Sequence, residues 1–381
     1  MKSFISSLLT ILLIFPWILG RLDFETREND SRLYTIFVQQ LNKKPLSKIV
    51  TLEWGNNSPY EDPNNPYVRD HLIGQFIPSV ILSKLGIDPR YAHYTINQVY
   101  RFLFPLIIYF LVLKIFGSSA AIVSLIASHL NVVNLNYVFR ANQELPLLFF
   151  LFISVYGLFF ETRRSRFAYY FGCIGSFLVK GLAGIIQYPI WFIRDFFFQN
   201  NKKQVVSRYV LLSLLLLATA GLYELWFRTT TGNEFWPAYF NIQVFGRNPK
   251  AGSFPMKSFP YYFSRSIGYA LPWFLGCYFI IRSWRLNLLN EEQKKLITTF
   301  LSISISYILI FSLFSRAASR YIFPTYFLMT VLGAIGISIK IKDRIESRVF
   351  KSPILIHQVL YWLILITNLV IFAIRGKNFT V

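Results

Sequence analysis

Long apolar blocks separated by polar connectors recur along almost the whole chain. Most blocks run for about 15 to 21 residues, close to the ~20 residues of helix that cross a ~30 Å hydrocarbon core. Apolar residues fill whole blocks instead of one stripe of period 3.6, which does not fit the half-buried helices of a water-soluble domain. Only 15% of the residues are charged, against about 25% in a typical soluble protein. We therefore predict an all-α polytopic membrane protein, with residues 1–381 forming a single integral membrane domain.

The first block, residues 4–19, has the length of a span or of a signal peptide. Bulky Trp17 and Ile18 precede Arg21 and do not match the small residues of a cleavage site, so we expect a retained span, with cleavage as the alternative. Residues 21–97 are mostly polar and contain several prolines, which predicts a long first loop with short helices. Nine further blocks follow, at residues 99–113, 120–137, 145–160, 167–193, 209–226, 267–281, 296–314, 321–339 and 354–374.

Four basic clusters set the expected orientation. They lie at residues 163–166, 194–208, 282–295 and 340–351, and the positive-inside rule assigns all four to the cytoplasm. The first two can share one side only if the intervening block, 167–193, turns back near Lys180 and Gly181. Counting that block twice predicts about eleven transmembrane helices, and makes residues 21–97 and 227–266 the first and second extracytoplasmic loops.

The net charge of +21 comes from 39 Lys and Arg against 18 Asp and Glu. Because the basic residues gather in the connectors, they are explained by orientation and do not indicate nucleic acid as a partner. The two cysteines lie inside apolar blocks, which excludes a disulfide framework and a cysteine-based zinc site. No P-loop or dinucleotide fingerprint occurs, so a soluble nucleotide donor is not supported.

Two carboxylates, Asp23 and Glu25, directly follow the first predicted span. Acids at the rim of a bilayer are expected to have a function. They could act as a general base, or hold a divalent metal ion, which would be the only cofactor. The alternative is a solvated start of the loop, with Arg21 and Arg27 as ion partners.

Lys180 interrupts an apolar block and has no acidic residue within ten positions. A buried, unpaired ammonium group is costly, so an anionic ligand is a natural partner, and a distant Asp or Glu is the alternative. Arg316 and Arg320 lie between two predicted spans, on the side opposite the basic clusters. Guanidinium groups match phosphate geometry, which points to phosphate binding.

Two more polar groups fall in the expected extracytoplasmic segments. Asp70 and His71 precede an apolar stretch, where Asp70 could bind substrate or cap a helix. Arg140 and Glu144 lie in a short connector, where they could bind substrate or form an ion pair that holds the turn.

These motifs, taken in order, resemble those of GT-C glycosyltransferases of the protein O-mannosyltransferase and lipid A aminoarabinose-transferase superfamily. The most specific is Phe177-Leu178-Val179-Lys180-Gly181, which is similar to the family's Leu-Thr-Lys-Gly turn. The other matching segments are residues 23–27, 70–72, 142–145, 232–235 with Arg247, 272–273 and 314–324. Three departures are present: Phe24 separates the two acids, two prolines are absent after His71, and Glu144 stands where Asp is commoner.

The resemblance implies a GT-C-like bundle that moves a sugar from a polyprenyl-phosphate donor to an acceptor, with inversion, on the extracytoplasmic side of the cell (inner) membrane. Lys180 and Arg320, with Arg316, would hold the donor phosphate, and Asp23 or Glu25 would be the base. Substrate contacts would come from Asp70, His71, Arg140, Glu144, Glu234 and Arg247.

The acceptor would be a glycolipid, a glycan or a protein. A transporter or flippase with an intramembrane lipid or ion site is the alternative, although we find no inverted repeat of the kind common in transporters. A noncatalytic relative that binds polyprenyl lipid is a third reading.

Overall fold

The computed structural model describes residues 29–54, 65–137, 140–160, 162–199, 201–245, 256, 258–314 and 318–344. These ranges are mainly helical, and their extended pairing is limited to one isolated bridge between Glu53 and Tyr67. Five helices in them are long and apolar enough to cross a membrane. The predicted all-α class is thus confirmed for this part of the chain. The count of eleven is not, because the blocks at 4–19 and 354–374 lie outside the described residues.

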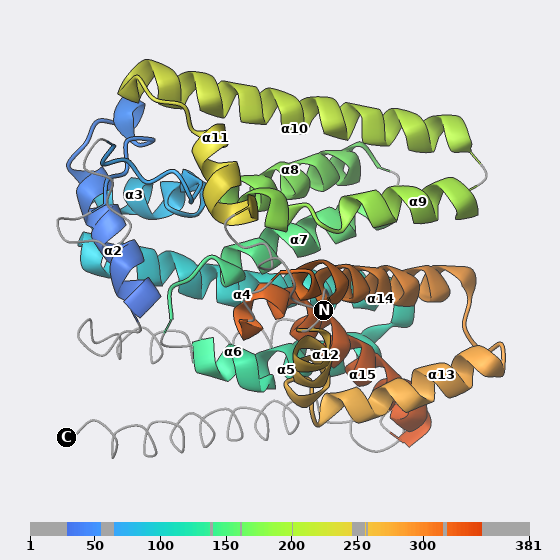
Figure 1. The fold of residues 1–381 in the computed structure, drawn as a ribbon. Helices are drawn as coiled ribbons and strands as arrows, with labels where there is room; N and C mark the ends of the chain where they lie inside the picture. The colour runs from blue at the N-terminus through green and yellow to red at the C-terminus, as the bar shows by residue number, and fades with distance from the viewer. Residues whose placement is uncertain are drawn as a thin grey trace, which may run out of the picture.

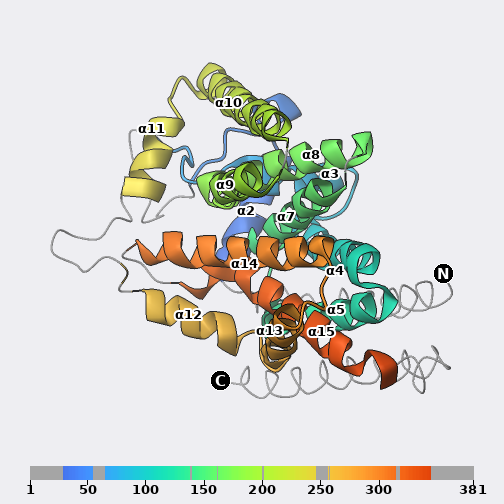
Figure 2. The same cartoon turned by 90° about the vertical axis from the view of Figure 1, so that its right-hand side faces the viewer.

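The bundle is built from long helices that run side by side, with α15 crossing them (Figure 1). The short helices α2 and α3 lie together at one end of the bundle, and α11 lies nearby (Figure 1; Figure 2 shows the bundle from its other end). The long helices are α4 (Pro89–Phe116), α7 (Glu144–Phe159), α8 (Arg163–Lys180), α10 (Lys202–Thr231), α14 (Glu291–Ser312) and α15 (Phe323–Arg344). The shorter ones are α2 (Asn29–Asn42), η1 (Leu46–Lys48), η2 (Ile73–Gln75), α3 (Ile77–Lys84), α5 (Ser118–Leu130), α6 (Val132–Asn136), η4 (Gly181–Gly184), α9 (Tyr188–Phe198), α11 (Trp236–Tyr239), η5 (Phe240–Val244), α12 (Phe259–Gly268), η7 (Trp273–Gly276), α13 (Cys277–Arg285) and η8 (Ser319–Ile322).

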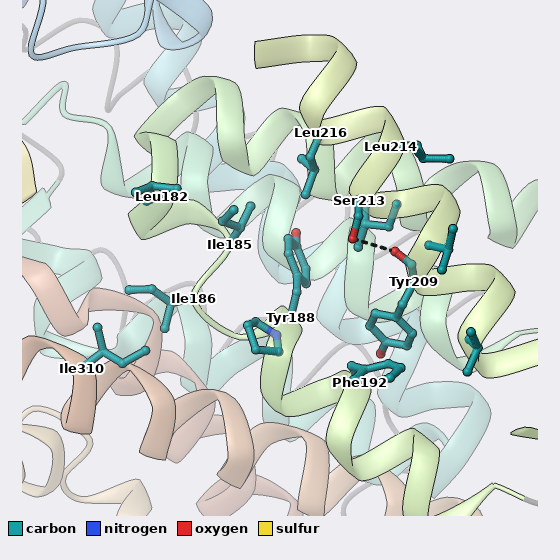
Figure 3. A pocket seen from close by; sticks show the side chains of 14 residues that line it. Leu182, Ile185, Ile186, Tyr188, Phe192, Tyr209, Ser213, Leu214, Leu216 and Ile310 are labelled. Atoms are coloured by element: carbon teal, nitrogen blue, oxygen red, sulfur yellow. Dashed lines mark hydrogen bonds between the residues drawn. The ribbon is translucent and has the colours of Figure 1, made fainter. Parts of the chain in front are cut away.

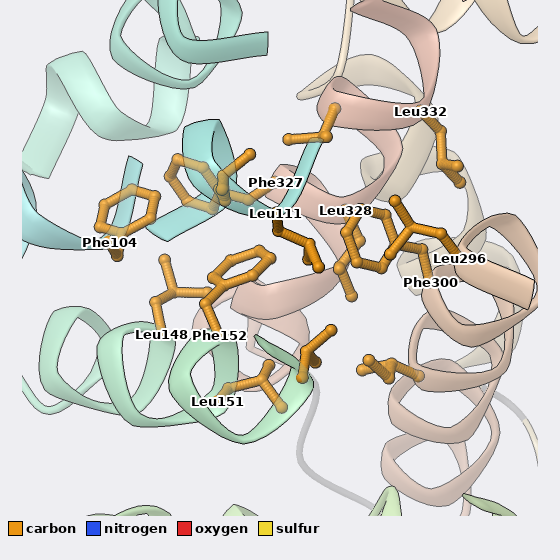
Figure 4. Packing of buried hydrophobic residues seen from close by; sticks show 14 of the residues in the cluster. Phe104, Leu111, Leu148, Leu151, Phe152, Leu296, Phe300, Phe327, Leu328 and Leu332 are labelled. Carbon is orange, nitrogen blue, oxygen red and sulfur yellow. The ribbon is translucent and has the colours of Figure 1, made fainter. Parts of the chain in front are cut away.

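The core lies where α4, α7, α14 and α15 meet (Figure 4). Phe104 of α4 packs edge-on against Phe327 of α15, with ring centroids 5.0 Å apart. Phe152 of α7 packs in the same way against Phe300 of α14, and all four rings are fully buried. Such edge-to-face pairs contribute about 0.5–1.5 kcal/mol each beyond their buried area.

The first loop ends earlier than predicted, because α4 begins at Pro89 and not near Asn97. Asp88 caps this helix by accepting a hydrogen bond from the Arg90 backbone N–H at 2.8 Å, and proline suits the first helical position. The Arg90 side chain also donates to the carboxylate and holds the pKa of Asp88 below its usual value.

Two predicted spans are interrupted. The block at 267–281 is divided between α12 and α13, with Pro272 in the gap; proline has no N–H for a continuous helix. The block at 120–137 breaks after Leu130, where the Asn131 side chain accepts a hydrogen bond from the Val133 N–H at 2.8 Å and starts α6. Neither block is a single helix, which corrects both predictions.

Three of the basic clusters come together at one end of the bundle. Arg194 of α9 donates to Thr299 of α14, and Lys295 of α14 lies 5.2 Å from the ring centre of Phe159, at the end of α7. In Figure 1 this is the end where α9 leads to α10 and α13 leads to α14. Lys180 closes the other end of α8, and 18 residues of helix separate the two ends by about 27 Å.

Candidate functional site

The helix α8 ends at Lys180, at the position where the sequence predicts a turn. Gly181 follows with φ of +57°, in the left-handed region that favours glycine. A Cβ at Gly181 would overlap the hydroxyl of Tyr239, and that hydroxyl accepts a hydrogen bond from the Leu182 N–H at 3.3 Å. The turn therefore holds α11 directly over the end of α8.

Replacing Gly181 with Ala is expected to destabilise the protein, because the new Cβ meets Tyr239 and the backbone conformation is strained. Strain of this kind costs about 1–3 kcal/mol, so the thermal midpoint of the purified protein should fall by several degrees. Gly232, which caps α10 with φ of +74° and has open space around it, is the matched control. Gly232→Ala should have the smaller effect, and an equal loss in both variants would show that the Tyr239 contact does not matter.

Lys180 forms a buried ion pair with Glu144, the first residue of α7. Its Nζ lies 3.3 Å from Glu144 Oε1, and the two side chains are 11% and 3% exposed. The second carboxylate oxygen, Oε2, is buried and has no hydrogen-bond partner among the described residues. Of the two predicted partners for Lys180, the structure shows the distant acidic residue. One carboxylate oxygen of Glu144 has no hydrogen bond among the described residues. Arg140 stacks on Tyr137, with its guanidinium carbon 5.2 Å from the ring centre.

The helix α2 connects this pair to Arg320. Asp30, in the first turn of α2, forms an ion pair with Arg320 of η8. The next residue, Ser31, donates to Asn142 Oδ1 at 2.8 Å and accepts from the Ala141 N–H at 2.9 Å. Asn142 lies two residues before Glu144, so one short helix ties the Arg320 contact to the segment that carries the Lys180 partner.

Asp70 and His71 lie in the same region. His71 Nδ1 is 2.7 Å from Asp70 Oδ1, and Gln243 donates to Asp70 Oδ2 at 3.3 Å. The other ring nitrogen of His71 lies 3.3 Å from the Tyr34 hydroxyl, which accepts a hydrogen bond from Gln143 at 2.8 Å. Leu72 occupies the N-cap position of η2, so Asp70 does not cap that helix and lies against His71.

The structure does not bring every predicted residue together. Glu234 is exposed and pairs with Arg228 at the end of α10. Asp23, Glu25, Arg247 and Arg316 lie outside the described residues. No group of three His, Cys, Asp or Glu side chains suited to a metal ion occurs in the described part, and the metal proposed for Asp23 and Glu25 falls beyond it.

Several contact residues escaped the sequence analysis, among them Asp30, Tyr34, Tyr239 and Gln243. Their positions in the chain carry no recognisable motif. Only the polar character of the segment after the first predicted span could have drawn attention to Asp30 and Tyr34.

A wide apolar groove adjoins the turn (Figure 3). It has a volume of about 630 Å³ and begins at Leu182, Ile185 and Ile186, directly after Lys180. Its walls are α9 and α10, with Ile310 of α14 at one side. Val210, on the α10 wall, is 51% exposed, so the groove reaches the apolar surface of the bundle.

Neither the protein-family models nor the curated protein sequences gave a match to this chain. Among solved structures, it is similar to ArnT from Cupriavidus metallidurans bound to undecaprenyl phosphate, with a TM-score of 0.68 and 14% identity over 87% of this chain. The apo form of the same ArnT gives the same TM-score and identity over 89% of this chain. This chain spans about 60% of the length of those ArnT chains.

Proposed function

We propose that this chain, which has the fold of the GT-C glycosyltransferase ArnT, is a membrane glycosyltransferase that uses a polyprenyl-phosphate-linked sugar. The observation that carries the proposal is the apolar groove that begins at the turn bearing Lys180. A lipid phosphate has the same two parts, an apolar chain and an anionic head. The fold match to a structure that holds undecaprenyl phosphate supports the assignment.

The donor would enter sideways from the membrane, with its isoprenoid chain between α9 and α10. Because the isoprenoid chain comes from the hydrocarbon of the bilayer, the groove would bind it through van der Waals packing and not through removal from water. Its phosphate would lie at Lys180, with Arg320 and Arg316 as further cations. In this arrangement Lys180 exchanges part of its contact with Glu144 for the donor phosphate. The cations then stabilise the negative charge that develops on the departing phosphate.

The transfer step inverts the sugar. The acceptor hydroxyl forms a bond to the anomeric carbon while the bond from that carbon to the phosphate oxygen breaks, and the electron pair leaves with the polyprenyl phosphate. The acceptor proton passes to Asp23 or Glu25 as general base. These acids precede Asp30 by seven and five residues, and Asp30 itself contacts Arg320. An acceptor phosphate would react in the same way.

The other polar groups would bind the acceptor or the sugar, on the extracytoplasmic side. His71, which lies between Asp70 and Tyr34, would exchange its contact with the Tyr34 hydroxyl for a sugar hydroxyl. Arg140, Glu144, Glu234 and Arg247 complete the proposed substrate contacts. The acceptor class is a glycolipid, a glycan or a protein.

The direct test is transfer by the purified full-length chain in lipid nanodiscs. Polyprenyl-phosphate sugars of several kinds would be supplied with glycolipid, glycan and peptide acceptors, and the release of polyprenyl phosphate measured by chromatography. NMR of the product would report inversion at the anomeric carbon, and a chelator arm would report a metal requirement. Donor binding without release of polyprenyl phosphate in any acceptor mixture would reject the enzyme and favour a lipid-binding protein.

Replacing Arg320 with Gln is expected to raise the KM for donor by about 10-fold or more, because a charge-assisted hydrogen bond contributes about 1.5–3 kcal/mol. Asp30→Asn is the matched control, since it weakens the same ion pair but keeps the cation. Steady-state kinetics would separate the two. If Asp30→Asn raises the KM as much as Arg320→Gln, the ion pair matters for structure and Arg320 does not bind phosphate.

A further inference from the structure

A second, smaller cavity lies at the opposite end of the bundle from the proposed site. Its volume is about 110 Å³, and the end of α7 and the first turns of α8 and α10 enclose it. The polar residues that line it include Arg166 and Tyr169 of α8 and Gln204 and Arg208 of α10. Among the described residues, no acidic side chain lines it. The cavity is therefore positively charged.

Within the described residues, the two arginines that line this cavity are only partly neutralised, because Arg208 has one long ion pair and Arg166 has none. The Arg166 side chain is exposed and forms no ion pair there. Arg208 Nη1 lies 3.8 Å from Asp195 Oδ2, a long contact. Asp195 is already held by Arg194, at 2.6 Å. The Arg208 guanidinium thus keeps donors for another anion.

Two further features favour an anion. The Tyr169 hydroxyl is buried and makes no hydrogen bond of ordinary geometry to the described residues. Both α8 and α10 begin at this cavity, and the N-terminus of a helix carries a partial positive charge and free N–H groups. The buried hydroxyl and the two arginines, beside the first turns of α8 and α10, together form a site suited to an anion.

The size and surroundings of the cavity limit which anions could bind in it. A volume of about 110 Å³ admits one phosphate group but not a nucleotide, because drug-sized ligands occupy pockets of about 300–1,000 Å³. Phe167 and Phe171 stack on each other beside Arg166, with ring centroids 5.8 Å apart, and are 70% and 46% exposed. Exposed apolar rings on a helix that is long and apolar enough to cross a membrane suit contact with lipid chains.

We propose that this cavity binds the phosphate group of an anionic membrane lipid, through Arg166 and Arg208, with Gln204 and Tyr169 as additional donors. Bidentate contacts from arginine suit a phosphate diester or monoester. A lipid bound there would hold the first turns of α8 and α10 against the end of α7. The site lies at the opposite end of α8 from Lys180 and does not depend on the proposed function.

The test counts lipids retained by the purified full-length chain in native mass spectrometry. Phosphatidylglycerol, phosphatidic acid and phosphatidylcholine would be supplied in turn, and inorganic phosphate in a separate titration. The test variants are Arg166→Gln and Arg208→Gln. The matched control is Arg163→Gln with Arg164→Gln, which removes exposed positive charges from the same turn of α8 but leaves the cavity unchanged.

We expect each test variant to retain an anionic lipid about tenfold less well than the native chain, and the control to retain it normally. Phosphatidylcholine, whose head is zwitterionic, should bind weakly to all of them. One outcome is that inorganic phosphate binds the native chain but not Arg166→Gln, with no preference among lipids. The cavity would then be a phosphate site whose ligand is free phosphate and not a lipid headgroup. Equal retention in all variants, or an equal loss in the Arg163 and Arg164 control, would overturn the proposal.

Discussion

Replacing Asp23 with Asn is expected to lower the rate of sugar transfer by about 10²–10⁴-fold, the usual contribution of a general base. Asparagine has the same size as aspartate but cannot accept the acceptor proton at neutral pH. Donor binding should change little, because the proposed phosphate contacts belong to Lys180 and Arg320. The measurement is the turnover rate at saturating donor, with donor affinity determined separately.

Glu25→Gln is the matched control. The two acids are separated only by Phe24, so either of them could be the general base. The two variants should differ strongly, because one carboxylate takes the proton. If Asp23→Asn keeps full activity and Glu25→Gln abolishes it, Glu25 is the base. Normal turnover in both would remove these residues from the reaction.

Replacing Lys180 with Ala is expected to abolish donor binding and to destabilise the protein. Glu144 would be left as a buried, unpaired charge, since its side chain is only 3% exposed. Removing one partner of a buried ion pair costs about 3–5 kcal/mol. Thermal unfolding in detergent and donor binding by a fluorescent lipid phosphate would be measured on the same preparation.

Two variants separate the stability effect from the binding effect. Lys180→Ala with Glu144→Ala removes both charges, and should recover much of the stability while binding stays lost. Glu144→Gln keeps the cation, and should bind donor at least as well as the native chain, because the ammonium no longer has a competing carboxylate. Donor affinity that is unchanged in Lys180→Ala would remove Lys180 from the phosphate site. A double variant that regains binding would show that the pair is structural.

The membrane class and the end of α8 could be predicted from the chain because both depend on local signals. Apolar blocks of spanning length report the solvent that surrounds a helix, and a lysine followed by glycine inside such a block marks a break. The basic clusters likewise share an end in the structure. The predicted helix boundaries were wrong where a capping residue or a proline fell within or beside a predicted element. Asp88 with Pro89 moved the start of α4, and Asn131 and Pro272 each divided a predicted span.

The sequence could not predict which side chains contact the candidate site residues. Lys180 pairs with a residue 36 positions away, and Arg320 contacts Asp30 across most of the chain. Sequence spacing carries no information about such contacts, because they arise only when α2, α7, α8 and η8 pack at one end of the bundle.

The amino-acid sequence by itself determined that this chain belongs in a membrane, where its charges gather and which lysine interrupts a helix, since hydropathy and helix breaking act over a few residues. Only the tertiary structure decided that Lys180 faces Glu144, that an apolar groove begins at Leu182, and that Arg166 and Arg208 share a cavity. Each of these depends on the packing of helices distant in the chain, and packing is a property of the whole fold.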